Sequence, residues 1–266
     1  GRVIQGKAEG GEGAVIGPDS LLAETGPVLV SKDSGEIDPV DPVVLDHNEV
    51  IVVNKAVGEA VEVGRYVDNE WENGPLQIFF RQAIAGPNLP PNGLLRVVYW
   101  NNLEHWSRGL AALPSPVGPR AHLNEIMSCD ESNRSFFLTR NIGGQGGAYG
   151  GGENNVSMSS ARACQVKPGN TIEDVYSALA ENNAPYREQG DRTTYQLSQR
   201  FLGPREGLEM GTGLLIRMVG DTSHGLAARL DMSPKIAGVS DEFPVVNCLD
   251  RSLWESHVIH WSLPPE

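Results

Sequence analysis

Short apolar runs, separated by clusters of glycine and proline, make up most of the chain after residue 45. Several of these runs are rich in β-branched and aromatic residues, which is typical of strands. The pattern predicts strands at 50–53, 60–63, 76–80, 93–100, 134–139, 193–197, 211–219, 226–233 and 254–261. The 31 glycines and 18 prolines favour many turns and no long helices.

One segment has the period of an amphipathic helix rather than that of a strand. Asn170 or Thr171 can cap its start, and Glu173 or Asp174 follows in the first turn. Apolar residues then recur at helical spacing, namely Ile172, Val175, Tyr176 and Leu179. The pattern predicts a helix over 171–182 that ends before Pro185, and a second, weaker one over 103–110.

The final third of the chain predicts a hairpin. Residues 212–219 form an apolar strand, Asp221–Gly225 is a short polar turn, and 225–232 alternates like a partner strand. Because no alternation of strands with helices and no repeat is visible, we predict an all-β fold. The expected architecture is an antiparallel jelly-roll β-sandwich with an extended N-terminal arm and few short helices. Its parts are the arm at 1–45, the sandwich at 46–233 and a C-terminal extension packed on the body at 234–266.

The first 45 residues contain few apolar groups. Four prolines at 18, 27, 39 and 42 argue against a helix there. A segment of this composition cannot offset a backbone ordering cost of about 1–2 kcal/mol per residue, so we expect neighbouring copies to hold it. The chain begins at Gly1 and ends at Glu266, and we interpret both as ends produced by cleavage of a viral polyprotein.

Composition excludes several classes of function. A net charge of −13 with no basic run argues against a protein that grips nucleic-acid phosphates. No apolar run approaches the ~20 residues of a membrane span, and no signal peptide opens the chain. The cysteines are odd in number and widely spaced, so we expect Cys129, Cys164 and Cys248 to be reduced.

Each candidate for chemistry has a simpler interpretation. The glycine-rich run Gly143–Gly152 lacks a following helix start and a Gly-Lys-Ser/Thr signature, which a phosphate loop requires. His257 and His260 lie three apart, which puts them on opposite faces of a strand. Glu104 with His105, and His122 with Cys129, lack any supporting motif. We therefore predict no catalytic, cofactor-binding or metal-binding residue, and no cofactor.

With such ends, such an arm and no active site, the chain resembles the capsid proteins of picorna-like, positive-strand RNA viruses. The specific likeness is Gly211–Ser233, which is similar to the last two strands of their jelly rolls. The resemblance implies a structural protein, not an enzyme, that assembles into an icosahedral virion shell in the host cytoplasm. Its expected partners are other copies of itself and sibling capsid proteins, with weak or no direct nucleic-acid contact.

Two other classes stay open. One is a structural protein of a tailed phage, either a tail-tube or a decoration protein. The other is a β-sandwich enzyme or carbohydrate-binding module, which would need aromatic residues gathered in a cleft. The tryptophans are instead scattered along the chain, at 71, 100, 106, 254 and 261.

Overall fold

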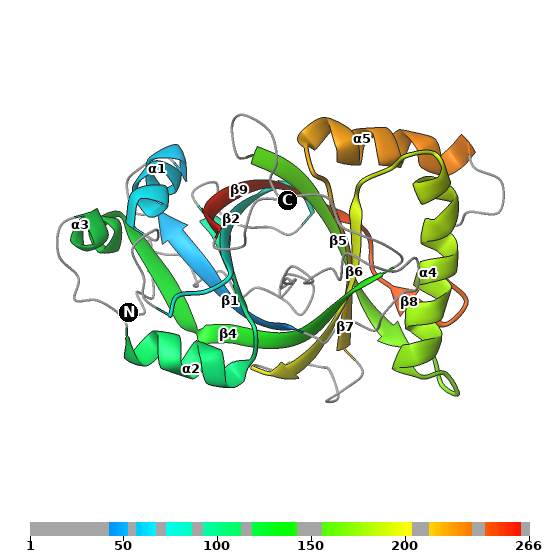
Figure 1. The fold of residues 1–266 in the computed structure, drawn as a ribbon, viewed down its shortest axis with the longest axis horizontal. Coiled ribbons are helices and arrows are strands. Elements are labelled where there is room, and N and C mark those ends of the chain that lie inside the picture. Colours follow the sequence, from blue (N-terminus) through cyan, green and yellow to red (C-terminus); the bar gives the residue numbers. More distant parts are fainter. Residues whose placement is uncertain are drawn as a thin grey trace, which may run out of the picture.

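The elements follow one another in two rounds of the same order: strand, helix, two strands, helical segment, strand (Figure 1). The computed structural model describes residues 43–52, 57–67, 73–86, 93–112, 119–142, 156–203, 213–235 and 243–261. The first round contains β1 (Val43–Val52), α1 (Val57–Val67), β2 (Gln77–Ala85), β3 (Gly93–Trp100), α2 (Leu103–Ala111), α3 (Pro119–Ile126) and β4 (Met127–Ile142). The second contains β5 (Val156–Val166), α4 (Ile172–Glu188), β6 (Thr194–Leu202), β7 (Gly213–Val219), α5 (Ser223–Met232), the short 3₁₀ helix η2 (Ser233–Lys235), β8 (Val246–Cys248) and β9 (Ser252–Trp261).

Each round is a split βαβ unit of the ferredoxin-like kind. The strand order is β4-β1-β3-β2 in the first unit and β6-β7-β5-β9 in the second. In both, the first and third strands lie in the centre, and the second and fourth lie at the edges. The short strand β8 pairs with the far end of β5, beyond β9.

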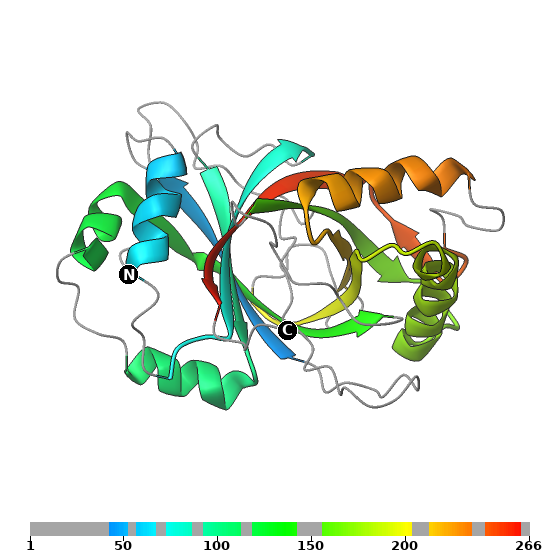
Figure 2. The ribbon, with the colours of Figure 1, turned by 45° about the horizontal axis from the view of Figure 1, so that its top comes forward.

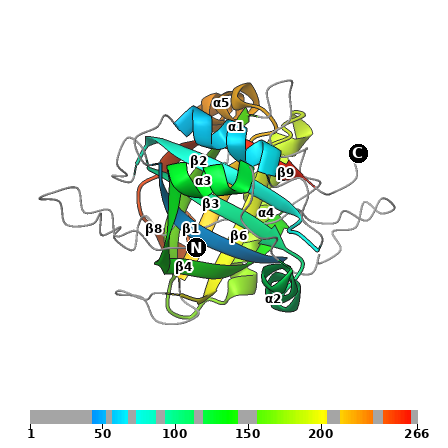
Figure 3. The same ribbon diagram turned by 90° about the vertical axis from the view of Figure 1, so that its left-hand side faces the viewer.

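The two units join edge to edge and close a barrel. One seam pairs β2 with β9, and the other pairs β4 with β6. Together with the β5–β7 pairing, these seams make a ring of eight strands in the described part of the chain, and every pairing in it is antiparallel. Helices α1, α2 and α3 cover one side of the barrel, and α4 and α5 cover the opposite side (Figures 2 and 3).

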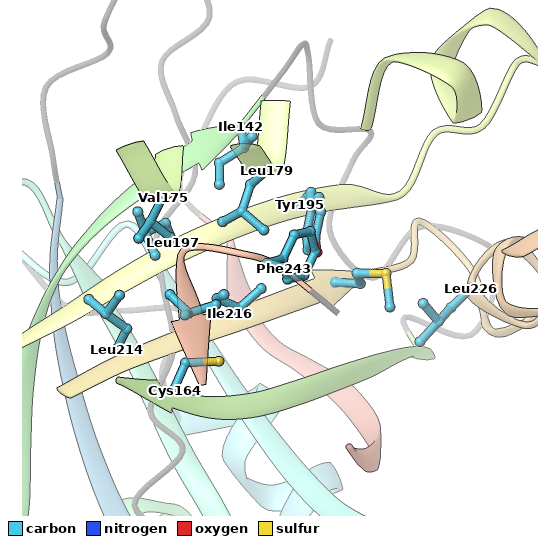
Figure 4. Close-up of a cluster of buried hydrophobic side chains, with 12 residues drawn as sticks. Ile142, Cys164, Val175, Leu179, Tyr195, Leu197, Leu214, Ile216, Leu226 and Phe243 are labelled. Atoms are coloured by element: carbon cyan, nitrogen blue, oxygen red, sulfur yellow. The ribbon is translucent and has the colours of Figure 1, made fainter. Parts of the chain in front are cut away.

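Apolar clusters of the described residues separate the inside of the barrel from its outside. On one outer face, Val175 and Leu179 of α4 pack over Leu197 and Ile216 of the barrel wall (Figure 4). On the other, residues of α1 pack against Ile78 and its neighbours on β2. A further cluster comes from strands alone and faces the interior: Phe79, Leu95, Val97, Tyr99, Phe137, Ala161, Leu215, Val219, Trp254 and Val258.

The predicted jelly-roll sandwich is wrong. The sheet closes on itself, and the chain does alternate strands with helices in two structural repeats. Strand β9 lies inside the expected C-terminal extension, 234–266, yet it forms part of both the barrel wall and a seam. Residues 43–45 of the expected arm belong to β1, and the rest of the arm lies outside the described residues.

The predicted hairpin at 212–219 and 225–232 is also wrong, because its second half is helix α5. The Thr222 hydroxyl accepts a hydrogen bond from the Gly225 amide at 3.0 Å, which caps the helix start. The expected strand at 60–63 lies within α1. The helix predicted at 171–182 is confirmed as α4, which continues past Pro185, and that at 103–110 is confirmed as α2.

The expectation of reduced cysteines fails for two of the three. Cys164 on β5 and Cys248 on β8 face each other in register and form a disulfide across 84 residues of sequence. Cys129 is a free cysteine and is half-buried. The sequence contains no signal for this bond, because the pairing arises only when β8 returns to β5. No helix of the described part is long and apolar enough to cross a membrane.

Candidate functional site

The barrel interior is unusually polar for a buried core. Because alternate residues of a strand share a face, the residues two apart from the interior apolar cluster also point inward. Many of them are polar and almost completely buried: Gln77, Arg81, Ser135, Thr139, Asn141, Ser157, Ser159, Thr194, Gln196, Ser198, Arg217, Ser252 and Ser256. A buried polar group costs free energy unless it forms a hydrogen bond. The hydrogen bonds of these side chains therefore indicate which of them are available to a bound molecule.

One polar row crosses three neighbouring strands. Arg81 of β2 lies opposite Ser256 of β9, and Ser256 lies opposite Ser157 of β5. The Arg81 Nε–H donates a hydrogen bond to the Ser256 hydroxyl at 2.9 Å. The guanidinium carbon also lies 5.3 Å from the centre of the Phe79 ring. We refer to Arg81, Ser256 and Ser157 as the arginine row.

Several buried groups near this row have no hydrogen-bond partner among the described residues. They are the hydroxyls of Ser157 and Ser159 and both polar atoms of the Gln77 carboxamide. All three side chains are 0% exposed. Leaving such a group without a hydrogen bond costs about 1–3 kcal/mol. A bound molecule that forms these hydrogen bonds would recover that free energy.

A second network of side-chain hydrogen bonds connects β7, β6 and β4. Arg217 donates to the Gln196 carbonyl oxygen at 2.8 Å, and the Gln196 amide donates to the Asn141 side-chain oxygen at 2.8 Å. Two residues along the same pair of strands, the Thr139 hydroxyl donates to the Ser198 hydroxyl at 2.9 Å. Several polar groups on this side of the barrel therefore bond to each other.

The inward-facing side chains that the structure describes include positively charged groups. Three of them are arginines, Arg81, Arg200 and Arg217. Burial lowers the pKa of Arg200, which packs over the Phe137 ring at 5.3 Å. Strand β1 contributes His47 and Glu49 at the register positions opposite Val97 and Leu95.

The aromatic groups lie beside the polar ones. Phe79 and Tyr99 meet edge to face, with ring centres 5.5 Å apart. Trp254 lies opposite Ser159 and two residues before Ser256 of the arginine row. Its indole N–H donates a hydrogen bond to the Ser252 hydroxyl at 2.8 Å. The interior thus offers aromatic surfaces on both sides of a cationic, hydroxyl-rich row, an arrangement that suits a small organic anion.

Of the residues weighed in the sequence, His257, His105 and His122 lie outside the barrel. His257 faces outward from β9, where its ring contacts Glu255 at 2.9 Å. Burial is the largest influence and lowers the pKa of His257, although Glu255 acts in the opposite direction. His105 lies on α2 and accepts a hydrogen bond from the Asn101 amide at 3.3 Å, and burial lowers the pKa of His105.

His122 on α3 lies 3.6 Å from Glu125 and more than a third of its side chain is exposed. The described residues contain no group of three or more side chains that could hold a metal ion. The absence of a metal site therefore stays a prediction for the whole chain. The glycine-rich run Gly143–Gly152 lies outside the described residues.

Sequence reasoning missed the arginine row entirely. A signal was present, because Arg81 follows Phe79-Phe80 and Arg217 interrupts Leu-Leu-Ile-Arg-Met-Val, so each arginine stands inside an apolar strand. A charged residue at such a position is rarely buried without a role. Ser157 and Ser159 carried no signal, because their importance depends on strand pairing.

Several solved structures align with most of this chain. A protein from Lactobacillus acidophilus, provisionally named a monooxygenase, aligns with a TM-score of 0.50 at 10% identity, covering 83% of this chain and 95% of its own. An anthrone oxidase-like protein aligns at 0.48 and 15% identity, covering 88% and 95%. A protein of Fusobacterium nucleatum, also provisionally named a monooxygenase, aligns at 0.48 and 10% identity, covering 82% and 93%. No protein-family model and no curated protein matches the chain.

These comparisons correct the functional predictions. At 10% identity the first likeness shows the fold alone, and that fold is a curled antiparallel sheet with helices outside, not a viral jelly roll. The predictions of a capsid protein, a virion location and a phage structural protein therefore fail. The expectation that the chain is not an enzyme is contradicted as well, since the Lactobacillus acidophilus protein with this fold is named as a monooxygenase. Self-association was not tested and stays a prediction.

Proposed function

We propose that this chain is an enzyme of the monooxygenase class that binds a small organic substrate inside the barrel. The observation that carries the proposal is the buried polar lining of the interior, with Gln77, Ser157 and Ser159 unpartnered among the described residues. A bound substrate would supply the hydrogen bonds that the protein does not. The reaction class comes from the Lactobacillus acidophilus protein, whose fold this chain shares.

The source of electrons in a monooxygenase reaction decides what the assay must contain. A monooxygenase transfers one atom of dioxygen to its substrate and reduces the other to water. The two electrons come either from the substrate, which is then oxidised by its own loss of two hydrogens, or from an added reductant. Because a buried site excludes water, it protects reactive intermediates and strengthens the interactions that orient the substrate.

The direct test is oxygen uptake by the purified full chain. A panel of phenols, hydroquinones and polycyclic aromatic compounds is supplied under ¹⁸O₂, with and without NADH and flavin. We expect at least one compound to take up ¹⁸O, and Gln77→Leu to reduce its turnover without unfolding the protein. Gln82→Leu, on the same strand but facing outward, is the matched control and should keep full activity. No uptake with any compound, or equal turnover in Gln77→Leu, would overturn the proposal.

A further inference from the structure

We propose that the arginine row binds the carboxylate of an aromatic acid, so that the substrate of the proposed oxygenase is an aromatic carboxylate. This inference deepens the proposed function and rests on it. It goes beyond the fold likeness, because the name of the Lactobacillus acidophilus protein mentions no carboxylate substrate.

The geometry of the row suits one small anion. Residues directly opposite each other on antiparallel strands have Cβ atoms about 4.5–5.5 Å apart, so Arg81, Ser256 and Ser157 present their side chains next to one another. Ser159 lies two residues further along the same face of β5. A carboxylate over this row can therefore meet the guanidinium and serine hydroxyls together.

The donors are of the right kind. Ser256 accepts from Arg81, and since a hydroxyl carries one hydrogen of its own, that hydrogen can be donated to a ligand. The buried hydroxyls of Ser157 and Ser159 add two further donors that no described residue uses. Oxygen atoms of an anion accept several such bonds at once, and charge-assisted bonds are about twice as strong as neutral ones.

The flanking groups select an aromatic ligand. Phe79 pairs with Val258 on one side of the row, and Trp254 pairs with Ala83 on the other. A ring attached to the carboxylate would lie between these surfaces, where edge-to-face contact with aromatic side chains is favourable. A simple inorganic anion would gain the donors but not these contacts.

Binding measurements test the proposal. Naphthoate and its neutral isostere naphthamide are titrated into the full chain by calorimetry, with inorganic phosphate as a third probe. We expect naphthoate to bind at least about tenfold more tightly than naphthamide, because it forms hydrogen bonds to a full charge. Arg81→Gln should abolish that preference while leaving naphthamide binding nearly unchanged, and Arg81→Lys should restore part of it. Ser157→Ala with Ser159→Ala should weaken naphthoate binding severalfold.

Matched controls separate recognition from folding. Arg65→Gln removes a half-buried arginine on the outer side of β9, where it bonds to the Val258 carbonyl at 2.8 Å. Ser160→Ala removes the outward-facing serine that follows Ser159 on β5 and accepts a hydrogen bond from Arg251. Both should bind naphthoate like the wild type, and circular dichroism should show every variant folded. Equal binding of acid and amide, no binding of either, tightest binding of phosphate, or equal losses in Arg65→Gln and Arg81→Gln would each overturn the inference.

Failure of this inference can be told apart from failure of the proposed function. If a neutral aromatic compound is oxygenated and carboxylates do not bind, the oxygenase proposal stands and the carboxylate site is wrong. If naphthoate binds through the arginine row but no compound takes up oxygen, the site stands and the reaction class is wrong.

Discussion

At the scale of single residues, Gln77 and Gln196 are the same kind of side chain with opposite effects on stability. Both are buried inside the barrel at 0% exposure. Gln196 accepts from Arg217 and donates to Asn141, whereas the Gln77 carboxamide has no hydrogen-bond partner among the described residues. One glutamine therefore stabilises the fold, and the other costs stability that ligand binding would recover.

This difference predicts opposite effects of the same substitution. Gln77→Leu should raise the free energy of unfolding by about 1–2 kcal/mol, because it removes two buried polar atoms that lack partners. Gln196→Leu should lower it by about 1–3 kcal/mol, because it breaks two hydrogen bonds to buried groups. Urea unfolding of both variants measures the change. A loss of stability in Gln77→Leu comparable with that in Gln196→Leu would mean that Gln77 is already satisfied in the protein.

At the scale of elements, a buried ion pair attaches α5 to the start of β6. Arg229 of α5 pairs with Asp191, and both side chains are only 2% exposed. The guanidinium also lies 3.8 Å from the centre of the Tyr186 ring and 5.1 Å from that of Tyr195. Alternation along 226–232 suggested a strand, but Leu226 and Arg229 are the buried positions, three apart as on a helix.

Removing one partner of that pair should be costly. Asp191→Asn is expected to destabilise the protein by about 3–5 kcal/mol, because it leaves the Arg229 charge buried without its counterion. Glu173→Gln, which weakens the exposed pair with Arg140, is the control and should cost less than about 1 kcal/mol. Thermal and urea unfolding measure both. Equal, small losses would show that Arg229 is held by its tyrosines rather than by Asp191.

At the scale of the whole molecule, the two repeats are equivalent in fold and different in charge. Arg81 pairs with Leu95 and Ser256, and at the corresponding place in the second repeat Ser198 pairs with Leu215 and Thr139. Each seam therefore has a hydrogen-bonded polar pair, but only one of the two includes an arginine. This broken symmetry leaves the described part of the barrel with one arginine row, and that row is where we propose that the ligand binds.

The sequence revealed local structure better than long-range structure. Seven of the nine predicted strands overlap barrel strands and both predicted helices exist, because short periodic runs and the Thr171 cap act locally. The structural repeat is weakly visible in the sequence, because Gly-Leu-Leu begins both β3 and β7. In both repeats a helix-capping residue, Asn102 or Thr222, follows nine residues after that glycine. Closure of the barrel, the disulfide and the arginine row depend on pairings between distant strands, which no local pattern specifies.

The central claim is that the barrel interior holds a ligand, and a crystal structure of the full chain grown with naphthoate tests it most directly. We predict electron density for the ligand inside the barrel, with its carboxylate within hydrogen-bond distance of Arg81 and Ser157 and its rings between Phe79 and Trp254. Density on the outer surface alone, or an interior closed by the chain's own side chains with no ligand at saturating concentration, would contradict the account.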